Sequence, residues 1–197
     1  MRQLVYYIAG SLDGFIARED GSFDDFPWDD EFVAHLMESY PETLPAPMRP
    51  DARREENRRF DTVLMGRHTY QVGLDSGLTS PYPTLDQFVL STTLGTSPDP
   101  DVEVVSRDGV DFVERLKALP GKDVWICGGS SLATPLYHAG LIDRVILKLN
   151  PVVFGAGIPL FRERLANRPL VLESMERFPS GHVILDYAVA GKNRSGN

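Results

Sequence analysis

The chain has 197 residues, of which 42% are hydrophobic and 24% charged, and its formal net charge at pH 7 is −8. These values are typical of one soluble domain with a sizeable core, and the negative charge disfavours a nucleic-acid surface. A single cysteine, Cys127, excludes an intrachain disulfide, and the absence of a long apolar stretch argues against a transmembrane helix or a signal peptide, so we expect a cytoplasmic protein.

The first predicted element is a buried strand over Leu4 to Ala9, a run of β-branched and aromatic residues. Turn residues follow, and Phe15 to Ala17 is predicted to be a brief extended segment. A helix is predicted over Trp28 to Tyr40, because its apolar residues recur at the spacing of one helical face.

Residues 41–59 are predicted to be a surface excursion. Four prolines between Pro41 and Pro50 forbid regular structure there, and the charged stretch Asp51 to Arg59 is predicted to be a short solvated helix. The segment suits either a lid over a site or a contact with a partner subunit.

Strands alternate with helices through the rest of the chain. The predicted strands are Thr62 to Met65, Gln87 to Leu90, Val102 to Val105, Val124 to Cys127 and Arg144 to Leu149, followed by the antiparallel pair Leu170 to Met175 and His182 to Val189. The predicted helices begin near Arg67, Phe112 and Leu132, and a polar tail from Gly191 to Asn197 is expected to be disordered. This order predicts one α/β domain over residues 1–190, with a mostly parallel sheet and an antiparallel edge.

One strand end is typical of an anion-binding turn. Gly128 and Gly129 follow the strand that ends at Cys127, and Ser130 and Ser131 open the next helix. Glycines let a ligand approach the backbone, and the first N–H groups of a helix point at it. The alternative is a plain strand-to-helix corner, and we expect Cys127 itself to be a buried thiol.

A second strand end repeats the pattern. Gly66, Arg67 and Thr69 follow a predicted strand, and Ser91 and Thr92 follow the next one. Because open α/β sheets bind ligands at the carboxyl ends of their strands, both turns could hold one ligand with several phosphates. Arg67 could pair with a phosphate or, equally, form a surface salt bridge.

Several motifs of other enzyme classes are absent. The sequence contains no G-x-G-x-x-G fingerprint, no Walker lysine motif, no H-E-x-x-H helix and no G-x-S-x-G elbow. Its four histidines do not have metal-ligand spacing, so we expect no metal site.

The sequence resembles the dihydrofolate-reductase-like superfamily, and within it the branch of the C-terminal reductase domain of riboflavin-biosynthesis deaminase-reductases. The segments that carry this likeness are Ala9 to Ala17, Pro27-Trp28, Gly66 to Thr69, Cys127 to Ser130 and Asn150 to Gly157. The resemblance covers about residues 2 to 190 and implies a three-layer α/β/α fold, a cytoplasmic homodimer and NADPH as cofactor.

The resemblance also implies which residues bind that cofactor. The nicotinamide end would touch Ala9 and Ile16; Gly66, Arg67, Thr69, Ser91 and Thr92 would hold the adenosine phosphates; and Gly128, Gly129, Ser130, Ser131 and Leu132 would cradle the pyrophosphate. Arg67 is the candidate for reading the 2′-phosphate of NADPH. We place Trp28, Phe154 and Gly155 beside the substrate.

The sequence departs from the family at three places. The zinc deaminase domain is absent, Phe15 replaces a basic residue of the riboflavin reductases, and no carboxylate of Asp29 to Glu31 matches the pterin-orienting position of dihydrofolate reductases.

We therefore expect an NADPH-dependent reductase of a small pterin- or pyrimidine-like heterocycle. The alternatives are a riboflavin-pathway 5-amino-6-(5-phosphoribosylamino)uracil reductase and a non-catalytic nucleotide-binding module. Hydride transfer needs an accompanying proton, for which Asp13 and Asp30 are the candidates. Their alternative roles are a turn residue for Asp13 and helix N-terminal charge for Asp30.

Overall fold

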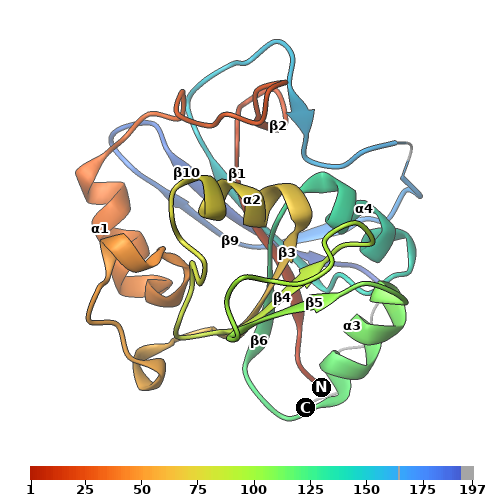
Figure 1. Ribbon diagram of the computed structural model, residues 1–197. Helices are drawn as coiled ribbons and strands as arrows, with labels where there is room; N and C mark the ends of the chain where they lie inside the picture. Colours follow the sequence, from red (N-terminus) through yellow and green to blue (C-terminus); the bar gives the residue numbers. More distant parts are fainter. Residues whose placement is uncertain (164, 192–197) are drawn as a thin grey trace.

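The computed structural model describes residues 1–163 and 165–191, and its centre is an eight-stranded sheet (Figure 1). The strands are β1 (Leu4–Gly10), β3 (Phe60–Gly66), β4 (Asp86–Leu90), β5 (Val102–Val105), β6 (Asp123–Gly128), β7 (Arg144–Leu149), β9 (Leu170–Arg177) and β10 (Val183–Val189). Their order across the sheet is β5-β4-β3-β6-β1-β7-β10-β9. The first six strands of that order, from β5 across to β7, pair in parallel with their neighbours. Strand β10 is antiparallel to both β7 and β9. The expected mixed sheet with an antiparallel edge is confirmed.

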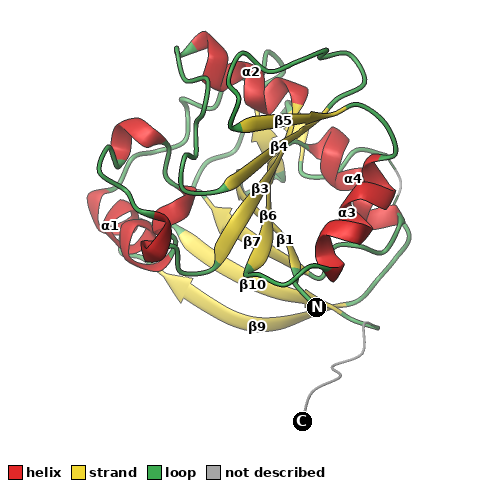
Figure 2. Cartoon of the chain, turned by 60° about the horizontal axis from the view of Figure 1, so that its bottom comes forward, coloured by secondary structure: helices red, strands yellow, loops and turns green. Residues whose placement is uncertain are grey.

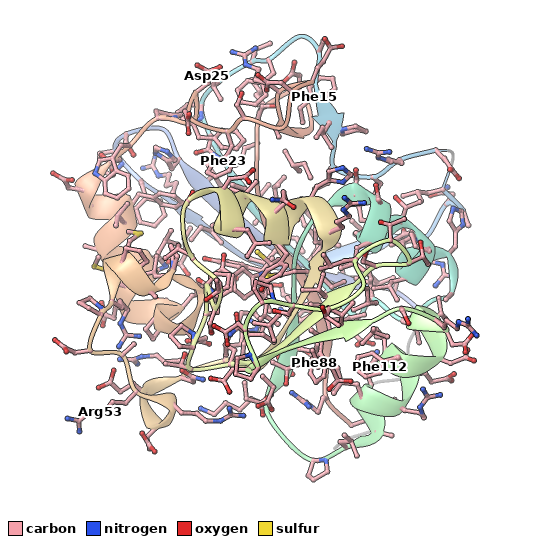
Figure 3. The ribbon with its side chains drawn as sticks, viewed as in Figure 1. Phe15, Phe23, Asp25, Arg53, Phe88 and Phe112 are labelled. Carbon is pink, nitrogen blue, oxygen red and sulfur yellow. The ribbon has the colours of Figure 1, made fainter. Side chains whose placement is uncertain are left out.

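Helices cover both faces of this sheet (Figure 2). They are α1 (Asp30–Ser39), α2 (Arg67–Asp75), α3 (Gly109–Ala118) and α4 (Ser130–His138). Helices α3 and α4 share one core with Leu4 and Tyr6 of β1, whereas α1 and α2 share the other core with Val5 and Tyr7. Alternate residues of β1 thus face opposite layers, as expected for a central strand buried on both sides. On the α3 face, Phe88 of β4 and Phe112 lie with ring centroids 5.0 Å apart (Figure 3).

This layering opens a crevice at the sheet edge. The neighbouring strands β3 and β6 are parallel, but β3 continues into α2 on one face and β6 into α4 on the other. Because the two helices leave in opposite directions, the carboxyl ends of the two strands stay uncovered between them. A small antiparallel pair, β2 (Phe15–Ala17) with β8 (Ile158–Pro159), lies at the same end of the molecule (Figure 1).

The structure departs from the sequence predictions in residues 41–59. The charged stretch 51–59 forms only a 3-10 turn at Arg54–Glu56 instead of a helix, because it lacks an apolar face that packing could stabilise. Pro41–Thr43, another 3-10 turn, is buried rather than part of a surface excursion. The predicted disordered tail lies outside the described residues, apart from Gly191.

Glu42 explains why this segment packs against the sheet. Its side chain is only 2% exposed. Its two carboxylate oxygens accept hydrogen bonds from the backbone N–H groups of Arg58, Arg59 and Phe60, at 3.1, 2.7 and 2.6 Å. One carboxylate therefore anchors the proline-rich segment to the start of β3.

We predict that Glu42→Ala lowers the free energy of unfolding by about 3 kcal/mol, because it leaves three N–H groups, including that of the buried Phe60, without their acceptor. Urea denaturation measures this loss. The control, Glu38→Ala on the exposed end of α1, should change stability by no more than about 0.5 kcal/mol. Equal stability of the two variants would show that the segment is held by other contacts.

Candidate functional site

A cleft of about 1220 Å³ opens at the carboxyl ends of the central strands. It brings together all twelve residues for which the sequence suggested cofactor contact. They are Ala9, Ile16, Gly66, Arg67, Thr69, Ser91, Thr92, Gly128, Gly129, Ser130, Ser131 and Leu132.

The two glycine turns lie against each other on the cleft floor. A Cβ atom built on Gly66 would lie 3.4 Å from the carbonyl oxygen of Gly128 and 3.6 Å from the backbone nitrogen of Gly129. Gly66 and Gly129 are also the N-cap residues of α2 and α4, and neither helix has a side-chain cap. Two helix N-termini thus face one space, which suits an anionic ligand.

Cations line the cleft near these turns. Arg67 donates a hydrogen bond from Nη1 to Oγ1 of Thr93 at 2.7 Å, and within the described part of the chain it forms no ion pair. The salt-bridge alternative for Arg67 is therefore absent there. Arg107 and Arg162 line the same cleft, although the sequence analysis did not select them. Arg107 could have been found, because it follows a strand end as Arg67 does.

The cleft also has an aromatic compartment, which we define by Tyr7, Tyr82, Trp125, Cys127 and Lys148. The rings of Tyr82 and Trp125 meet edge to face with centroids 4.8 Å apart, and Trp125 meets Tyr7 in the same way at 6.1 Å. The Tyr82 hydroxyl and the Cys127 thiol form a hydrogen bond at 3.5 Å. Tyr7 and Trp125 are only 1% and 3% exposed and pack against other rings, so the side chains that the compartment offers a ligand are chiefly the partly exposed Tyr82, Cys127 and Lys148.

Two groups of the compartment titrate away from their ordinary values. Burial raises the pKa of Cys127 to about 11, so the thiol stays protonated at neutral pH. Burial lowers the pKa of Lys148 to about 8, because the ammonium is poorly hydrated. Cys127 is not the fully buried thiol that we expected, since it is partly exposed and lines the cleft. Cys127 lies at the carboxyl end of the central strand β6, where the cleft opens, so its side chain lines the cleft.

Asp13, one candidate proton donor, is not among the residues that line this cleft. Its carboxylate accepts hydrogen bonds from the Ser11 hydroxyl at 2.6 Å and from the backbone N–H groups of Phe154 and Gly155 at 3.1 and 2.7 Å. These bonds, that of Ser11 first, lower the pKa of Asp13 to about 2. An ionised acceptor that joins two loops fits the turn-residue alternative better than proton donation.

Asp30 and Trp28 are also not among the residues that line the cleft. The indole Nε1 of Trp28 donates to Asp30 Oδ1 at 2.8 Å, and the Trp28 side chain is 68% exposed. Asp29 caps helix α1 by accepting from the N–H of Phe32. This arrangement favours helix-terminal charge as the role of Asp30.

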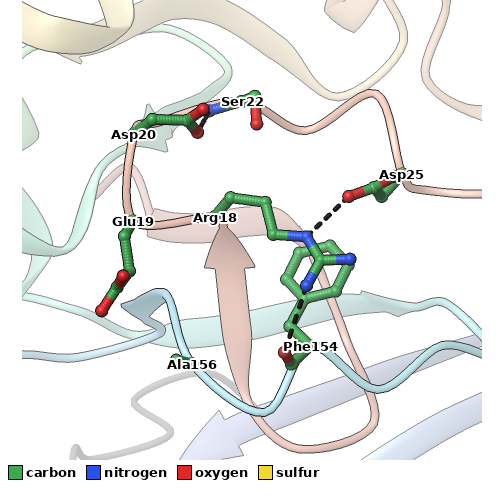
Figure 4. Close-up of a pocket in the computed structure, with 7 residues that line it drawn as sticks. All are labelled: Arg18, Glu19, Asp20, Ser22, Asp25, Phe154 and Ala156. Carbon is green, nitrogen blue, oxygen red and sulfur yellow. Dashed lines mark hydrogen bonds and ion pairs between the residues drawn. The ribbon is translucent and has the colours of Figure 1, made fainter.

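Phe154 lines a smaller surface hollow of about 470 Å³ (Figure 4), which shares Glu19 and Asp20 with the large cleft. Arg18 covers its ring with the guanidinium carbon 4.2 Å from the centroid, and donates to the Phe154 carbonyl at 3.1 Å and to Asp25 at 2.6 Å. Neither Phe154 nor Gly155 lines the large cleft. The structure therefore does not bring the three residues that we placed beside the substrate into the cofactor cleft.

Residues 1–163 and 165–191 contain neither a membrane-spanning helix nor a cluster of metal ligands. In this part of the chain, no helix has the length and apolarity needed to cross a membrane. No group of three or more His, Cys, Asp or Glu side chains is arranged there to hold a metal ion.

Known proteins resemble this chain along almost its whole length. The family model described as the RibD C-terminal domain matches residues 2–184. The uncharacterized protein YwjB of Bacillus subtilis (strain 168) is 33% identical over 177 residues, which are 90% of this chain and 92% of YwjB.

Two solved structures share the fold. A protein from Shewanella sp. PV-4, provisionally named a riboflavin biosynthesis protein, has a TM-score of 0.70 and 28% identity over 96% of this chain and 99% of its own. Dihydrofolate reductase from Enterococcus faecalis, complexed with NADP(H) and RAB-propyl, has a TM-score of 0.64 and 16% identity over 95% of this chain and 96% of its own.

Proposed function

This chain belongs to the RibD C-terminal domain family, and from that membership we propose that it is an NADPH-dependent reductase of a small pterin- or pyrimidine-like heterocycle. The observation that carries the proposal is the single cleft that gathers all twelve expected cofactor residues at the carboxyl ends of the central strands. The Enterococcus dihydrofolate reductase, which has the same fold, was solved with NADP(H).

The residues of the cleft fit such a cofactor. The uncapped N-termini of α2 and α4 would hold the phosphates, and Arg67 and Arg107 would add positive charge at that end. Ala9 and Ile16 would contact the nicotinamide, which supplies the hydride when bound. The aromatic compartment would take the flat substrate and keep water from it.

Fluorescence titration with NADPH, followed by NADPH consumption against a panel of pterins and pyrimidines, tests this function. We expect binding and turnover of at least one heterocycle. Binding without any turnover would instead indicate a nucleotide-binding module. Turnover of the ribosylaminouracil alone would indicate the riboflavin-pathway reductase.

We predict that Arg67→Ala weakens NADPH binding by about tenfold to hundredfold, because a charge-assisted contact with the 2′-phosphate is lost. NADH, which lacks that phosphate, should bind the variant and the wild type alike. Arg53→Ala is the matched control, since Arg53 is exposed and lies far from α2 (Figure 3). An equal loss for both nucleotides would remove Arg67 from this role.

A second variant tests the glycine turn. A Cβ atom on Gly129 would meet no protein atom closer than 3.7 Å, and the backbone there has φ −107°, which suits any residue. We therefore expect Gly129→Ala to fold normally, by thermal melting, but to bind NADPH more than about tenfold more weakly, because the methyl group fills the ligand's space. In Gly95→Ala, whose added methyl lies in open space, affinity should not change. Normal binding by Gly129→Ala would place the phosphates elsewhere.

We also propose that the protein is a homodimer that pairs through β9. This edge strand is exposed along all eight residues, and Leu170, Val171, Leu172 and Met175 are 43 to 59% exposed. An edge strand that pairs on one side only, as β9 does with β10, and that exposes apolar side chains is a template for an identical strand across a twofold axis.

We predict that Leu172→Asp converts the dimer into a monomer, because burying an unpaired carboxylate in the apolar contact removes its hydration at a large cost in free energy. Light scattering after size exclusion measures the mass. Val153→Asp, at an exposed loop residue outside β9, should leave the mass unchanged. A wild-type monomer at micromolar concentration would contradict the proposed dimer.

A further inference from the structure

Lys148 occupies an unusual place for a lysine, in the middle of the sheet. It pairs with Ala9 in the register of β7 with β1, so its side chain shares the sheet face of Ala9 and Tyr7. Its Nζ atom lies 4.2 Å from the centroid of the Tyr7 ring, and the side chain lines the cleft. The ammonium therefore lies on the floor of the aromatic compartment.

This ammonium has no oxygen partner among the described residues. The other lysines of that part of the chain are satisfied: Lys117 donates to Asp143 and to the carbonyl of Leu141, and Lys122 donates to the carbonyl of Asn57. Lys148 forms neither a hydrogen bond nor an ion pair there, and its neighbours are the Tyr7 ring and the Cys127 thiol. The side chain is partly exposed and reaches the cleft, so a ligand that supplies an acceptor would take the place of water at this ammonium.

Among the described residues, no hydrogen bond or ion pair joins Lys148 to a carboxylate. The two carboxylates on its sheet face have other partners, since Asp186 pairs with Arg144 and Glu176 with His35. Glu42 lies near Tyr7, but both of its oxygens accept backbone N–H groups at the start of β3. The acidic residues that line the cleft come from turns and helix termini and not from the strands of the floor: they are Glu19, Asp20, Asp75 and Asp108. The charged group that would face a ligand ring in the aromatic compartment is therefore the positive ammonium of Lys148.

We propose that Lys148 is a specificity-determining residue whose ammonium binds an acceptor oxygen or an anionic edge of the flat ring held in the aromatic compartment. The inference rests on the proposed function, since it concerns the substrate end of that cleft. It selects for rings that carry carbonyl oxygens, and against rings of equal shape that present amino groups or a positive charge. With its pKa lowered to about 8, Lys148 still carries its proton in most molecules at pH 7.

Two bicyclic probes of the same shape test this selection. Lumazine, the 2,4-dioxopteridine, presents carbonyl oxygens and loses a proton readily, whereas 2,4-diaminopteridine presents amino groups and gains one. Isothermal titration calorimetry at pH 7, with and without NADPH, measures both affinities. We expect the wild type to prefer lumazine, and Lys148→Met to lose about tenfold to hundredfold in lumazine affinity while gaining or keeping affinity for the diamino compound.

Further variants separate charge from folding. Lys148→Arg should keep the preference for lumazine, and Lys122→Met, a remote loss of one positive charge, should not alter it. Thermal melting checks that each variant is folded. Unchanged lumazine affinity in folded Lys148→Met, or a wild-type preference for the diamino probe, would overturn the proposal.

The NADPH titrations distinguish this inference from the proposed function. Normal NADPH binding without a probe preference would refute the role of Lys148 alone. A lumazine preference lost in Lys148→Met, in a protein that does not bind NADPH, would refute the cofactor and keep the role of Lys148. A fall in NADPH affinity in Lys148→Met as large as in Arg67→Ala would make Lys148 a cofactor contact and overturn the proposal.

Discussion

The cleft depends on the close approach of two strand ends. Gly66 at the end of β3 touches the Gly128–Gly129 turn at the end of β6, and side chains at these positions would fill the space between them. Because α2 and α4 then leave on opposite faces of the sheet, both helix N-termini face the same opening. Backbone packing at the sheet edge thus creates the anion-binding geometry, and side chains refine it.

Local charge in the cleft differs from the charge of the whole chain. The net charge is −8, yet Arg67 and Arg107 line the cleft, and its aromatic compartment carries Lys148. The net value governs solubility and long-range repulsion, whereas ligand recognition depends on the few charges that face the ligand at short range. A ligand with phosphates at one end and an oxygen-rich ring at the other would complement both regions.

Three carboxylates hold loops or a helix end in place. Asp13 joins the turn after β1 to residues 154–155, Glu42 joins the proline-rich segment to β3, and Asp29 caps α1. In each case the carboxylate satisfies backbone N–H groups that irregular segments would otherwise leave without acceptors. The carboxylate oxygens that accept these bonds are the same atoms that would carry a proton in catalysis. The sequence shows the carboxylate but not its partners, so it did not separate loop anchoring from proton donation.

The amino-acid pattern alone predicted the eight strands of the main sheet and the two glycine turns, and the family resemblance added the layered fold. Strand periodicity and glycine turns are local signals, and strand order brings the ends of β3 and β6 to one edge. The composition of the aromatic compartment depended instead on tertiary contacts. The tertiary structure moved Asp13, Asp30, Trp28 and Phe154 away from the cleft lining and placed Lys148, which sequence reasoning had passed over, on its floor. A lysine in the predicted strand Arg144 to Leu149 gives no sign of the face it occupies or of the partners it lacks, because both depend on contacts with β1 and β6, which are distant in sequence.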